Sequence, residues 1–95
     1  MDNNIKHQQN DEGGSFSYHY EGKRVGEMFY TNLKDGKLSI DHTEVDPSME
    51  GKGIGKLLLE ELVYYVRENK IKVIARCSFA SAKFKSHPEW QDVLY

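Results

Sequence analysis

Three glycines occur at alternate positions just before an apolar helical pattern. They are Gly51, Gly53 and Gly55, with Lys52 and Ile54 between them. Glycine loses more backbone freedom on folding than any other residue, so this spacing is unfavourable inside a helix or a strand. At the start of a helix, the same spacing lets backbone N–H groups point outward, where they can bind an anion such as a phosphate. The stretch therefore predicts either an anion site or a flexible loop.

Two common phosphate-binding motifs do not fit this stretch. The P-loop requires Gly, four residues, and then Gly-Lys-Ser/Thr. Here Glu50 occupies the position of the first glycine and Leu57 that of the hydroxyl, so the Mg²⁺ ligand is missing. The dinucleotide-binding fingerprint requires a third glycine two residues beyond Gly-x-Gly. Those positions hold Lys56 and Leu58. Neither motif explains the glycines.

Cys77, His42 and Glu44 are the side chains best suited to catalysis. Histidine has the right unperturbed pKa for a general base, and Glu44 shares a strand face with His42. Cys77 ends a predicted strand just before a helix N-terminus, so it is a candidate nucleophile or proton donor. Alternatively, it is a small apolar residue that seals the strand end. The four histidines show no metal-ligand spacing, so we predict no metal site.

Period-two alternation predicts an antiparallel meander in the first half of the chain. We expect strands at residues 15–20, 23–32 and 38–46, preceded by a short edge strand at Ile5–Gln9. A bulge is expected near Gly26, and a type I′ turn at Asp35-Gly36. In the strand at 38–46, simple alternation places Leu38, Ile40, His42 and Glu44 on one face.

The second half predicts a helix, a strand and a short helix. Apolar residues at three- and four-residue spacing indicate an amphipathic helix over residues 53–69. The strand that follows at 71–77 should lie parallel to the strand at 38–46, because a helix separates them. Ser78 is expected to cap a last helix at 79–86, with Trp90, Val93 and Leu94 packing as a C-terminal clamp. The predicted fold class is α+β.

The combined motifs resemble the GNAT superfamily of N-acetyltransferases. The acyl-coenzyme A loop of that family runs Gln or Arg, two residues, Gly, one residue, then Gly or Ala; Gly53 and Gly55 match it, while Glu50 departs from it. The resemblance from 15 to 95 is to small single-domain GNAT-like proteins of the YjdJ type. It rests on three further motifs: His42-Thr43-Glu44-Val45, Cys77-Ser78-Phe79-Ala80 and His87-Pro88-Glu89-Trp90.

The resemblance implies a minimal GNAT-like fold that uses acetyl-coenzyme A as co-substrate. The arm of the coenzyme would lie between two splayed parallel strands, and a backbone N–H near Val45 would polarise the acyl carbonyl. The implied coenzyme-binding residues are Val45, Glu50, Gly51, Lys52, Gly53, Ile54, Gly55 and Lys56. The implied activity is acetyl transfer to an unidentified amine, with Cys77, His42 and Glu44 as catalytic candidates. The alternatives are a non-catalytic coenzyme A-binding module and a partner-binding domain.

Length and composition set broader limits. A chain of 95 residues predicts one domain, with residues 1–13 as a partly mobile N-terminus. The net charge of −2 gives no basic footprint for nucleic acid. One cysteine excludes an intrachain disulfide and favours a reducing, cytoplasmic setting. No stretch is long and apolar enough to span a membrane. We expect a monomer or a weak dimer.

Overall fold

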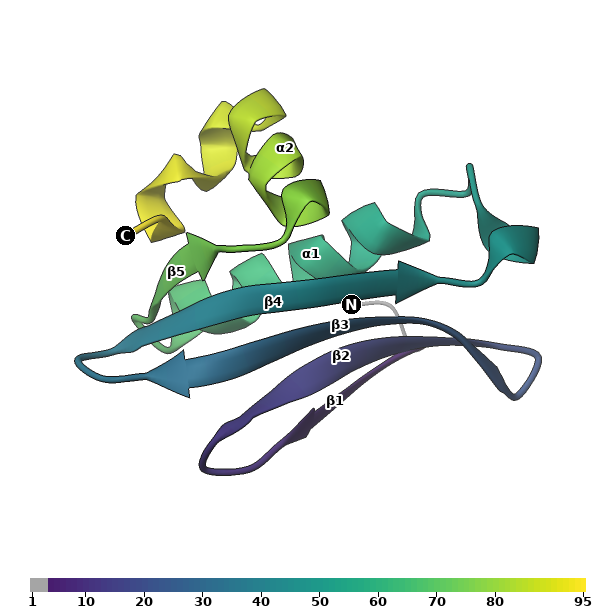
Figure 1. The fold of residues 1–95 in the computed structure, drawn as a ribbon, viewed down its shortest axis with the longest axis horizontal. Coiled ribbons are helices and arrows are strands. Elements are labelled where there is room, and N and C mark those ends of the chain that lie inside the picture. Colours follow the sequence, from purple (N-terminus) through teal and green to yellow (C-terminus); the bar gives the residue numbers. More distant parts are fainter. Residues whose placement is uncertain (1–3) are drawn as a thin grey trace.

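The computed structural model describes residues 4–95, so the first three residues of the expected mobile N-terminus lie outside it. Its five-stranded sheet has the order β1-β2-β3-β4-β5 (Figure 1). The first four strands are antiparallel: β1 (Ile5–Gln9), β2 (Gly13–Tyr20), β3 (Lys23–Leu33) and β4 (Lys37–Val45). The fifth, β5 (Lys72–Ala75), is parallel to β4. The predicted meander and parallel return strand are confirmed.

Helices lie in the connection that leads to β5 and in the segment that follows it. A short 3-10 helix, η1 (Pro47–Met49), leads from β4 to helix α1 (Ile54–Glu68). After β5 come helix α2 (Ser78–Ser86) and a second 3-10 helix, η2 (Pro88–Val93). In Figure 1, α2 and the yellow C-terminal segment lie beside β5, at the end of the sheet away from β1. The predicted α+β class is therefore confirmed.

A bulge in β4 changes which side of the sheet its residues face. Phe29 of β3 pairs with His42 but Tyr30 pairs with Ile40, so Asp41 is an extra residue. Ile40 is fully buried in the core, whereas His42 is exposed. Our expectation that His42 and Glu44 share a face with Leu38 and Ile40 is therefore wrong. The extra residue reverses the alternation, so that His42 and Glu44 lie on the side of the sheet away from the core.

The bulge predicted near Gly26 is present. The β2–β3 register shifts between Tyr18, which pairs with Gly26, and His19, which pairs with Arg24, so Val25 is the extra residue. In the β3–β4 hairpin, Leu33 pairs with Lys37, so residues 34–36 connect the two strands. A type I′ turn has a two-residue connection, so that prediction is wrong, although Asp35 and Gly36 both have positive φ, 63° and 70°.

The apolar stripe of α1 packs on one side of the sheet. Leu58, Leu62 and Val66 are completely buried, as are Met28 and Ile40 of the strands. A stripe of this kind stabilises the helix mainly through burial, at about 1.5–3 kcal/mol for each large side chain. The helix therefore holds its first turn in a fixed position beside the end of β4.

The C-terminal segment closes the core as predicted. Trp90 and Val93 are buried, and Leu94 is bridged to Val73 of β5. The start of α2 differs from the prediction, because Cys77 rather than Ser78 is its N-cap. The Cys77 sulfur accepts a hydrogen bond from the N–H of Ala80 at 3.4 Å. Within residues 4–95, no helix combines the length and the apolar character needed to cross a bilayer.

Candidate functional site

The two parallel strands separate halfway along β4. They pair only from Lys37–Lys72 to Ile40–Ala75. The N–H groups of Arg76 and Cys77 then both donate to the carbonyl of Ile40, at 3.0 and 3.1 Å, and the chain turns into α2. Because β5 ends there, the second half of β4 has no strand neighbour on that side within the described part of the chain. A gap therefore opens beside residues 41–45.

The amide of Val45 faces this gap. The N–H of the next residue, Asp46, points the other way and donates to Val25 of β3 at 2.8 Å. Successive residues of a strand direct their amides to opposite sides, so the Val45 N–H points away from β3. The extra residue Asp41 determines which way the Val45 N–H points, because it lies between Val45 and Ile40, whose carbonyl is directed toward β5. A carbonyl oxygen placed in the gap could accept a hydrogen bond from Val45.

The glycine loop ends in an uncapped helix N-terminus. Gly51 and Gly53 have φ of 79° and 77°, and a Cβ at either position would meet no atom within 4 Å. Gly53 is the N-cap of α1 and no side chain caps the helix. Leu57 donates to the Gly53 carbonyl at 3.0 Å. The N–H groups of Ile54, Gly55 and Lys56 therefore have no intrahelical acceptor and are available to an anion.

Gly55 serves a different purpose from the two glycines before it. A Cβ at Gly55 would lie 2.6 Å from the Cζ atom of Phe79, well inside contact distance. The absence of a side chain therefore lets the Phe79 ring of α2 lie against the first turn of α1. The ammonium of Lys83 is 5.7 Å from the centre of that ring, within range of a cation–π interaction. This contact links α2 to the helix N-terminus.

These elements enclose a cavity of about 500 Å³, which we call the loop pocket. It is lined by residues 43–45, 49–51 and 53–56, together with Phe79 and Lys83. Its charged lining residues are two lysines, Lys56 and Lys83, and two glutamates, Glu44 and Glu50. No acidic residue lies in the first turn of α1, so the helix dipole adds a positive potential there.

The turn into the loop is fixed by Asp46. Its carboxylate accepts hydrogen bonds from the backbone N–H of Ser48 at 2.9 Å and from the Ser48 hydroxyl at 2.8 Å. These bonds, the backbone one first, hold the pKa of the Asp46 carboxyl below its usual range. Asp46 therefore stays ionised and positions η1 between β4 and the glycines.

Cys77 lies beside the loop pocket and is not one of its lining residues. Its sulfur is 3.5 Å from the hydroxyl oxygen of Thr43, which does line the pocket. The side chain is partly exposed, and it caps α2 through the N–H of Ala80. The N-terminal end of a helix favours negative charge. The sulfur is thus placed next to the gap, at the N-terminal end of α2.

His42 and Glu44 lie together on the opposite side of the sheet. The Nε2 atom of His42 is 3.4 Å from an oxygen of Glu44, and both side chains are about 60% exposed (62% and 60%). The His42 ring stacks on Phe29, with 6.1 Å between ring centres. Both residues belong to the half of β4 that has no neighbour on the β5 side; Glu44 also lines the loop pocket, whereas His42 does not.

The structure thus brings together most of the predicted site residues. Those that line the loop pocket are Glu44, Val45, Glu50, Gly51, Gly53, Ile54, Gly55 and Lys56. Lys52, His42 and Cys77 do not line it. Thr43, Met49, Phe79 and Lys83 line it without having been assigned to it from the sequence. Phe79 could have been identified from its place in the Cys77-Ser78-Phe79-Ala80 motif. No group of three His, Cys, Asp or Glu side chains suited to a metal ion is found within residues 4–95.

Comparisons with known proteins agree with this geometry. A family model described as GCN5-related N-acetyl-transferase matches residues 15–93. The solution structure of a GCN5-like protein from Staphylococcus aureus is 33% identical to this chain. The match covers 98% of this chain and 90% of that one, with a TM-score of 0.74. A search of curated proteins found no match.

More distant structures share the fold. A ribosomal-protein alanine N-acetyltransferase from Escherichia coli is 19% identical over 82% of this chain and 53% of its own, with a TM-score of 0.70. A GNAT family acetyltransferase from Brucella melitensis, in complex with acetyl-CoA, is 19% identical over 65% of this chain and 44% of its own, with a TM-score of 0.60. This chain therefore spans about half the length of these two enzymes.

Proposed function

Because the chain belongs to the GCN5-related N-acetyltransferase family, we propose that it binds acetyl-coenzyme A in the loop pocket and transfers the acetyl group to an amine. One observation carries the proposal: a single pocket joins the free N–H groups at the start of α1 to the open edge of β4. The first feature suits the phosphates of the coenzyme and the second suits its thioester. The YjdJ subtype and the cytoplasmic location stay predictions.

The loop residues would hold the phosphates of the coenzyme. Gly51 and Gly53 leave open space in front of the helix, and the N–H groups of residues 54–56 supply hydrogen-bond donors. Lys56 and Lys83 add charge from two different helices. Glu50 departs from the family pattern, but its side chain is exposed and only its backbone needs to face the pocket. A carboxylate that turns outward leaves the anion site intact.

Val45 and Cys77 would act on the acetyl group from opposite sides of the gap. The N–H of Val45 polarises the thioester carbonyl, as an oxyanion-type donor. In a direct route, the amine nitrogen forms the new C–N bond, the C–S bond breaks, and Cys77 gives its proton to the leaving thiolate. In a covalent route, the Cys77 sulfur forms a new thioester as the C–S bond to the coenzyme breaks, and the coenzyme leaves as a thiol with the Cys77 proton. The amine then forms the C–N bond, the Cys77 thioester breaks, and Cys77 regains a proton.

His42 and Glu44 would receive the proton that the amine loses. Glu44 lies at the edge of the loop pocket and His42 lies next to it on the exposed side of β4, where an acceptor can approach from solvent. Both side chains are exposed, and their 3.4 Å contact allows one to support the other. His42 and Glu44 do not form a pocket that would select one acceptor amine over another.

Acetyl-coenzyme A binding is tested by thermal unfolding. A ligand at one hundred times its Kd adds about 2.7 kcal/mol of stability. For a domain of this size, 1 kcal/mol raises Tm by about 4–8 °C. We therefore expect a clear rise in Tm with acetyl-coenzyme A and with coenzyme A. An unchanged Tm at millimolar coenzyme would contradict both catalytic and non-catalytic coenzyme binding and would leave the partner-binding domain.

A non-catalytic coenzyme A-binding module is the second candidate function. It is favoured by the position of Cys77 and His42, which lie outside the pocket lining. A screen of amines for release of free coenzyme A separates the candidates. Catalysis predicts release that depends on one class of amine. If acetyl-coenzyme A binds but no amine causes release of free coenzyme A, and intact mass shows no acetyl group on Cys77, the result would support the binding module instead.

A further inference from the structure

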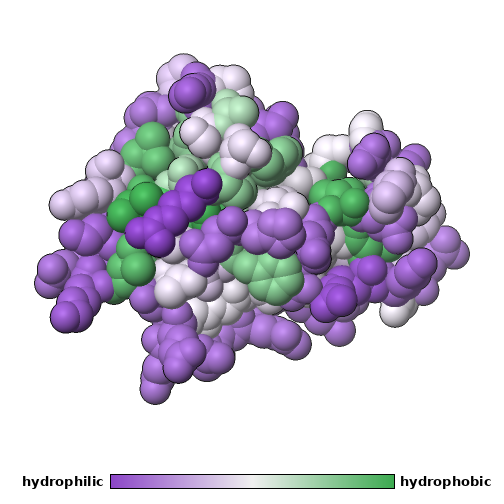
Figure 2. All heavy atoms as spheres, viewed as in Figure 1, coloured by the Kyte–Doolittle hydropathy of each residue, from purple (hydrophilic) through white to green (hydrophobic). Residues whose placement is uncertain are grey.

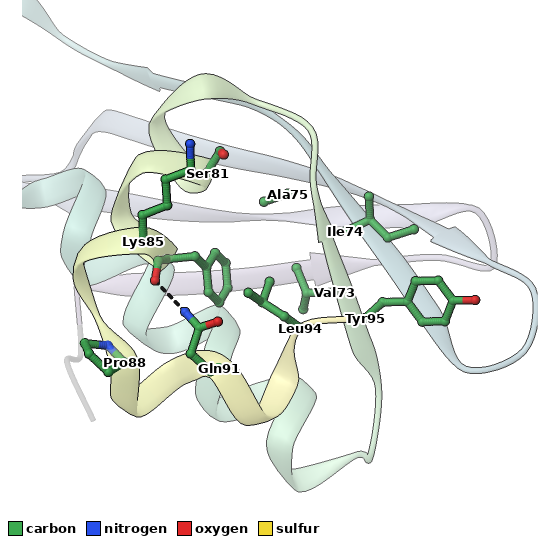
Figure 3. Close-up of a pocket in the computed structure, with 10 residues that line it drawn as sticks. Val73, Ile74, Ala75, Ser81, Lys85, Pro88, Gln91, Leu94 and Tyr95 are labelled. Carbon is green, nitrogen blue, oxygen red and sulfur yellow. Dashed lines mark hydrogen bonds between the residues drawn. The ribbon is translucent and has the colours of Figure 1, made fainter.

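A second cavity lies on the other side of α2 from the loop pocket. It has a volume of about 650 Å³, within the range of small-molecule sites. We call it the C-terminal pocket, and its lining residues come from β5, α2, η2 and the last two residues of the chain (Figure 3). None of them lines the loop pocket. This cavity is therefore separate from the proposed acetyl-transfer site.

The walls of the C-terminal pocket are tied to one another. The side-chain amide of Gln91 donates to the carbonyl of Phe84 at 2.7 Å, which joins η2 to α2. The ring of Trp90 packs edge-on against Phe84, with 6.0 Å between ring centres. The N–H of Tyr95 donates to the carbonyl of Val73 at 2.9 Å, which joins the C-terminal segment to β5. These contacts hold the walls of the pocket together.

The lining has a polar end and an apolar body. In Figure 3, Ser81 and Lys85 lie at one end with Gln91, Tyr95 lies at the other, and Val73 and Leu94 are between them. Figure 2 shows hydrophobic residues gathered, among hydrophilic ones, at the corner where Figure 1 places β5 and the C-terminal segment. An occupant should therefore have an apolar body and one polar head.

The charged side chains at this pocket indicate whether the polar head of the occupant is positive or negative. Lys85 is the only charged side chain among the lining residues, and Ser81, four residues earlier on α2, adds a hydroxyl beside it. No ion pair of Lys85 is found among the described residues. At the other end, the ammonium of Lys37 lies 4.1 Å from the centre of the Tyr95 ring. The positive charge in the lining is therefore at the Lys85 end, and this end favours an anionic head.

We propose that the C-terminal pocket binds a small amphiphilic carboxylate. Its carboxylate lies against Lys85 and Ser81, and its apolar body lies along Val73, Phe84 and Leu94. A carboxylate forms charge-assisted hydrogen bonds with an ammonium and a hydroxyl, and an alkyl or aromatic body buries apolar lining surface. The proposal concerns a second site and does not depend on acetyl-coenzyme A binding in the loop pocket.

Octanoate is a suitable probe, because octan-1-ol has the same alkyl chain without the charge. We expect saturable binding of sodium octanoate by isothermal titration calorimetry, and weaker binding of octan-1-ol. Lys85→Glu should weaken octanoate binding at least about tenfold, because it replaces a charge-assisted contact with repulsion. Lys83→Glu is the matched control, since Lys83 lies two residues away and lines the loop pocket instead. It should leave octanoate binding within about twofold.

Amide chemical shifts in the NMR spectrum give the location independently of any variant. Octanoate should shift the amides of Val73, Ser81, Lys85 and Gln91 and leave those of residues 51–56 unchanged. Thermal unfolding of each variant shows that it is folded before its affinity is compared. The proposal is overturned by shifts that fall elsewhere, by equal affinity of Lys85→Glu and wild type, or by the absence of saturation at millimolar octanoate.

Discussion

Helix α2 separates two pockets that are built in different ways. The loop pocket is made largely of backbone: the N–H groups of residues 54–56, two glycines with positive φ, and the open edge of β4. The C-terminal pocket is made largely of side chains, with Phe84, Leu94 and Val73 as walls and Lys85 as the one charged side chain in its lining. A backbone site binds through fixed dipoles, whereas a side-chain site binds through apolar area and one ammonium.

This difference determines which substitutions matter at each pocket. In the loop pocket, glycines set the backbone path, so adding a side chain should do more harm than removing one. In the C-terminal pocket, removing or reversing a side chain should have the larger effect. α2 supplies both with lysines two residues apart, Lys83 and Lys85, so each pocket provides a control for the other.

The largest effect is expected at Cys77, which starts α2 beside the loop pocket. Cys77→Ala should lower acetyl transfer to the best amine of the screen by about 100-fold or more, the usual contribution of a proton donor or nucleophile. Coenzyme affinity should stay within about twofold, because Cys77 does not line the pocket. The measurements are kcat/KM and calorimetric Kd.

Intact mass distinguishes the two roles of Cys77. A covalent route predicts an acetyl adduct on Cys77 of the wild type after incubation with acetyl-coenzyme A, and no adduct on Cys77→Ser. A direct route predicts no adduct on either protein. If Cys77→Ala keeps full kcat/KM, Cys77 only caps α2 and seals the strand end.

The next effect tests the backbone character of the loop pocket. Gly53→Val places a branched side chain at φ 77°, in front of the helix N-terminus. It should weaken coenzyme binding at least about tenfold by blocking the N–H groups that face an anion. Strain in the left-handed region adds a loss of about 1–2 kcal/mol in stability. Octanoate binding should not change.

Gly22→Val is the matched control for that substitution. Gly22 lies in the β2–β3 turn with φ 78°, and a Cβ there also meets no atom within 4 Å. It should lose similar stability and keep its coenzyme affinity. If Gly53→Val binds coenzyme as tightly as Gly22→Val does, the glycine loop is not the binding site.

Substitutions of the two lysines of α2 should have smaller effects on ligand affinity, each at a different pocket. Lys83→Glu should weaken coenzyme binding by about fivefold, because a partly exposed charge contributes about 1 kcal/mol at most. Lys85→Glu should leave it unchanged and weaken octanoate instead. Each Kd is measured by calorimetry at low and high salt, and the Lys83 effect should shrink at high salt. Equal losses in both variants would mean that the pockets are not independent.

The smallest effect lies away from both pockets, in an aromatic cluster on β1. His7 stacks on Phe16 at 3.9 Å between ring centres and bonds to the Tyr30 hydroxyl at 2.7 Å. Burial lowers the pKa of His7 below its ordinary 6.5. The unfolded state therefore binds protons first, so stability is lost as pH falls below about 6.5 and is fully present above it.

This pH dependence provides a reference for the two pockets. Between about pH 7.5 and pH 5.5, the Tm of wild type should fall by a few degrees more than that of His7→Gln. Coenzyme and octanoate affinities should respond to pH equally in the two proteins. An equal fall in Tm for both would show that His7 does not contribute to the pH dependence of stability.

Local patterns predicted the elements that the site needs. The helix from Ile54 follows from its apolar spacing and its glycine start, and the parallel return strand follows from the helix between the two strands. The glycine spacing predicts an anion site or a flexible loop, and anion binding there stays a prediction. These features depend on residues close in sequence, and the spacing of the apolar ones indicates which side chains are buried.

Contacts between distant residues could not be read in the same way. The extra residue Asp41 becomes visible only when β4 is paired with β3, and it moves His42 and Glu44 to the side away from the core. The approach of Phe79 to Gly55 joins two helices across β5. The C-terminal pocket requires four separate segments to meet. None of these contacts produces a periodic pattern in the sequence from which it could be predicted.

Titration of acetyl-coenzyme A into labelled protein, followed by the amide chemical shifts, is the most direct test of coenzyme binding in the loop pocket. We expect the largest shifts for Val45 and for Ile54, Gly55 and Lys56, with Val73 and Leu94 unchanged. Shifts confined to the C-terminal pocket, or saturable binding that leaves residues 51–56 unmoved, would contradict it.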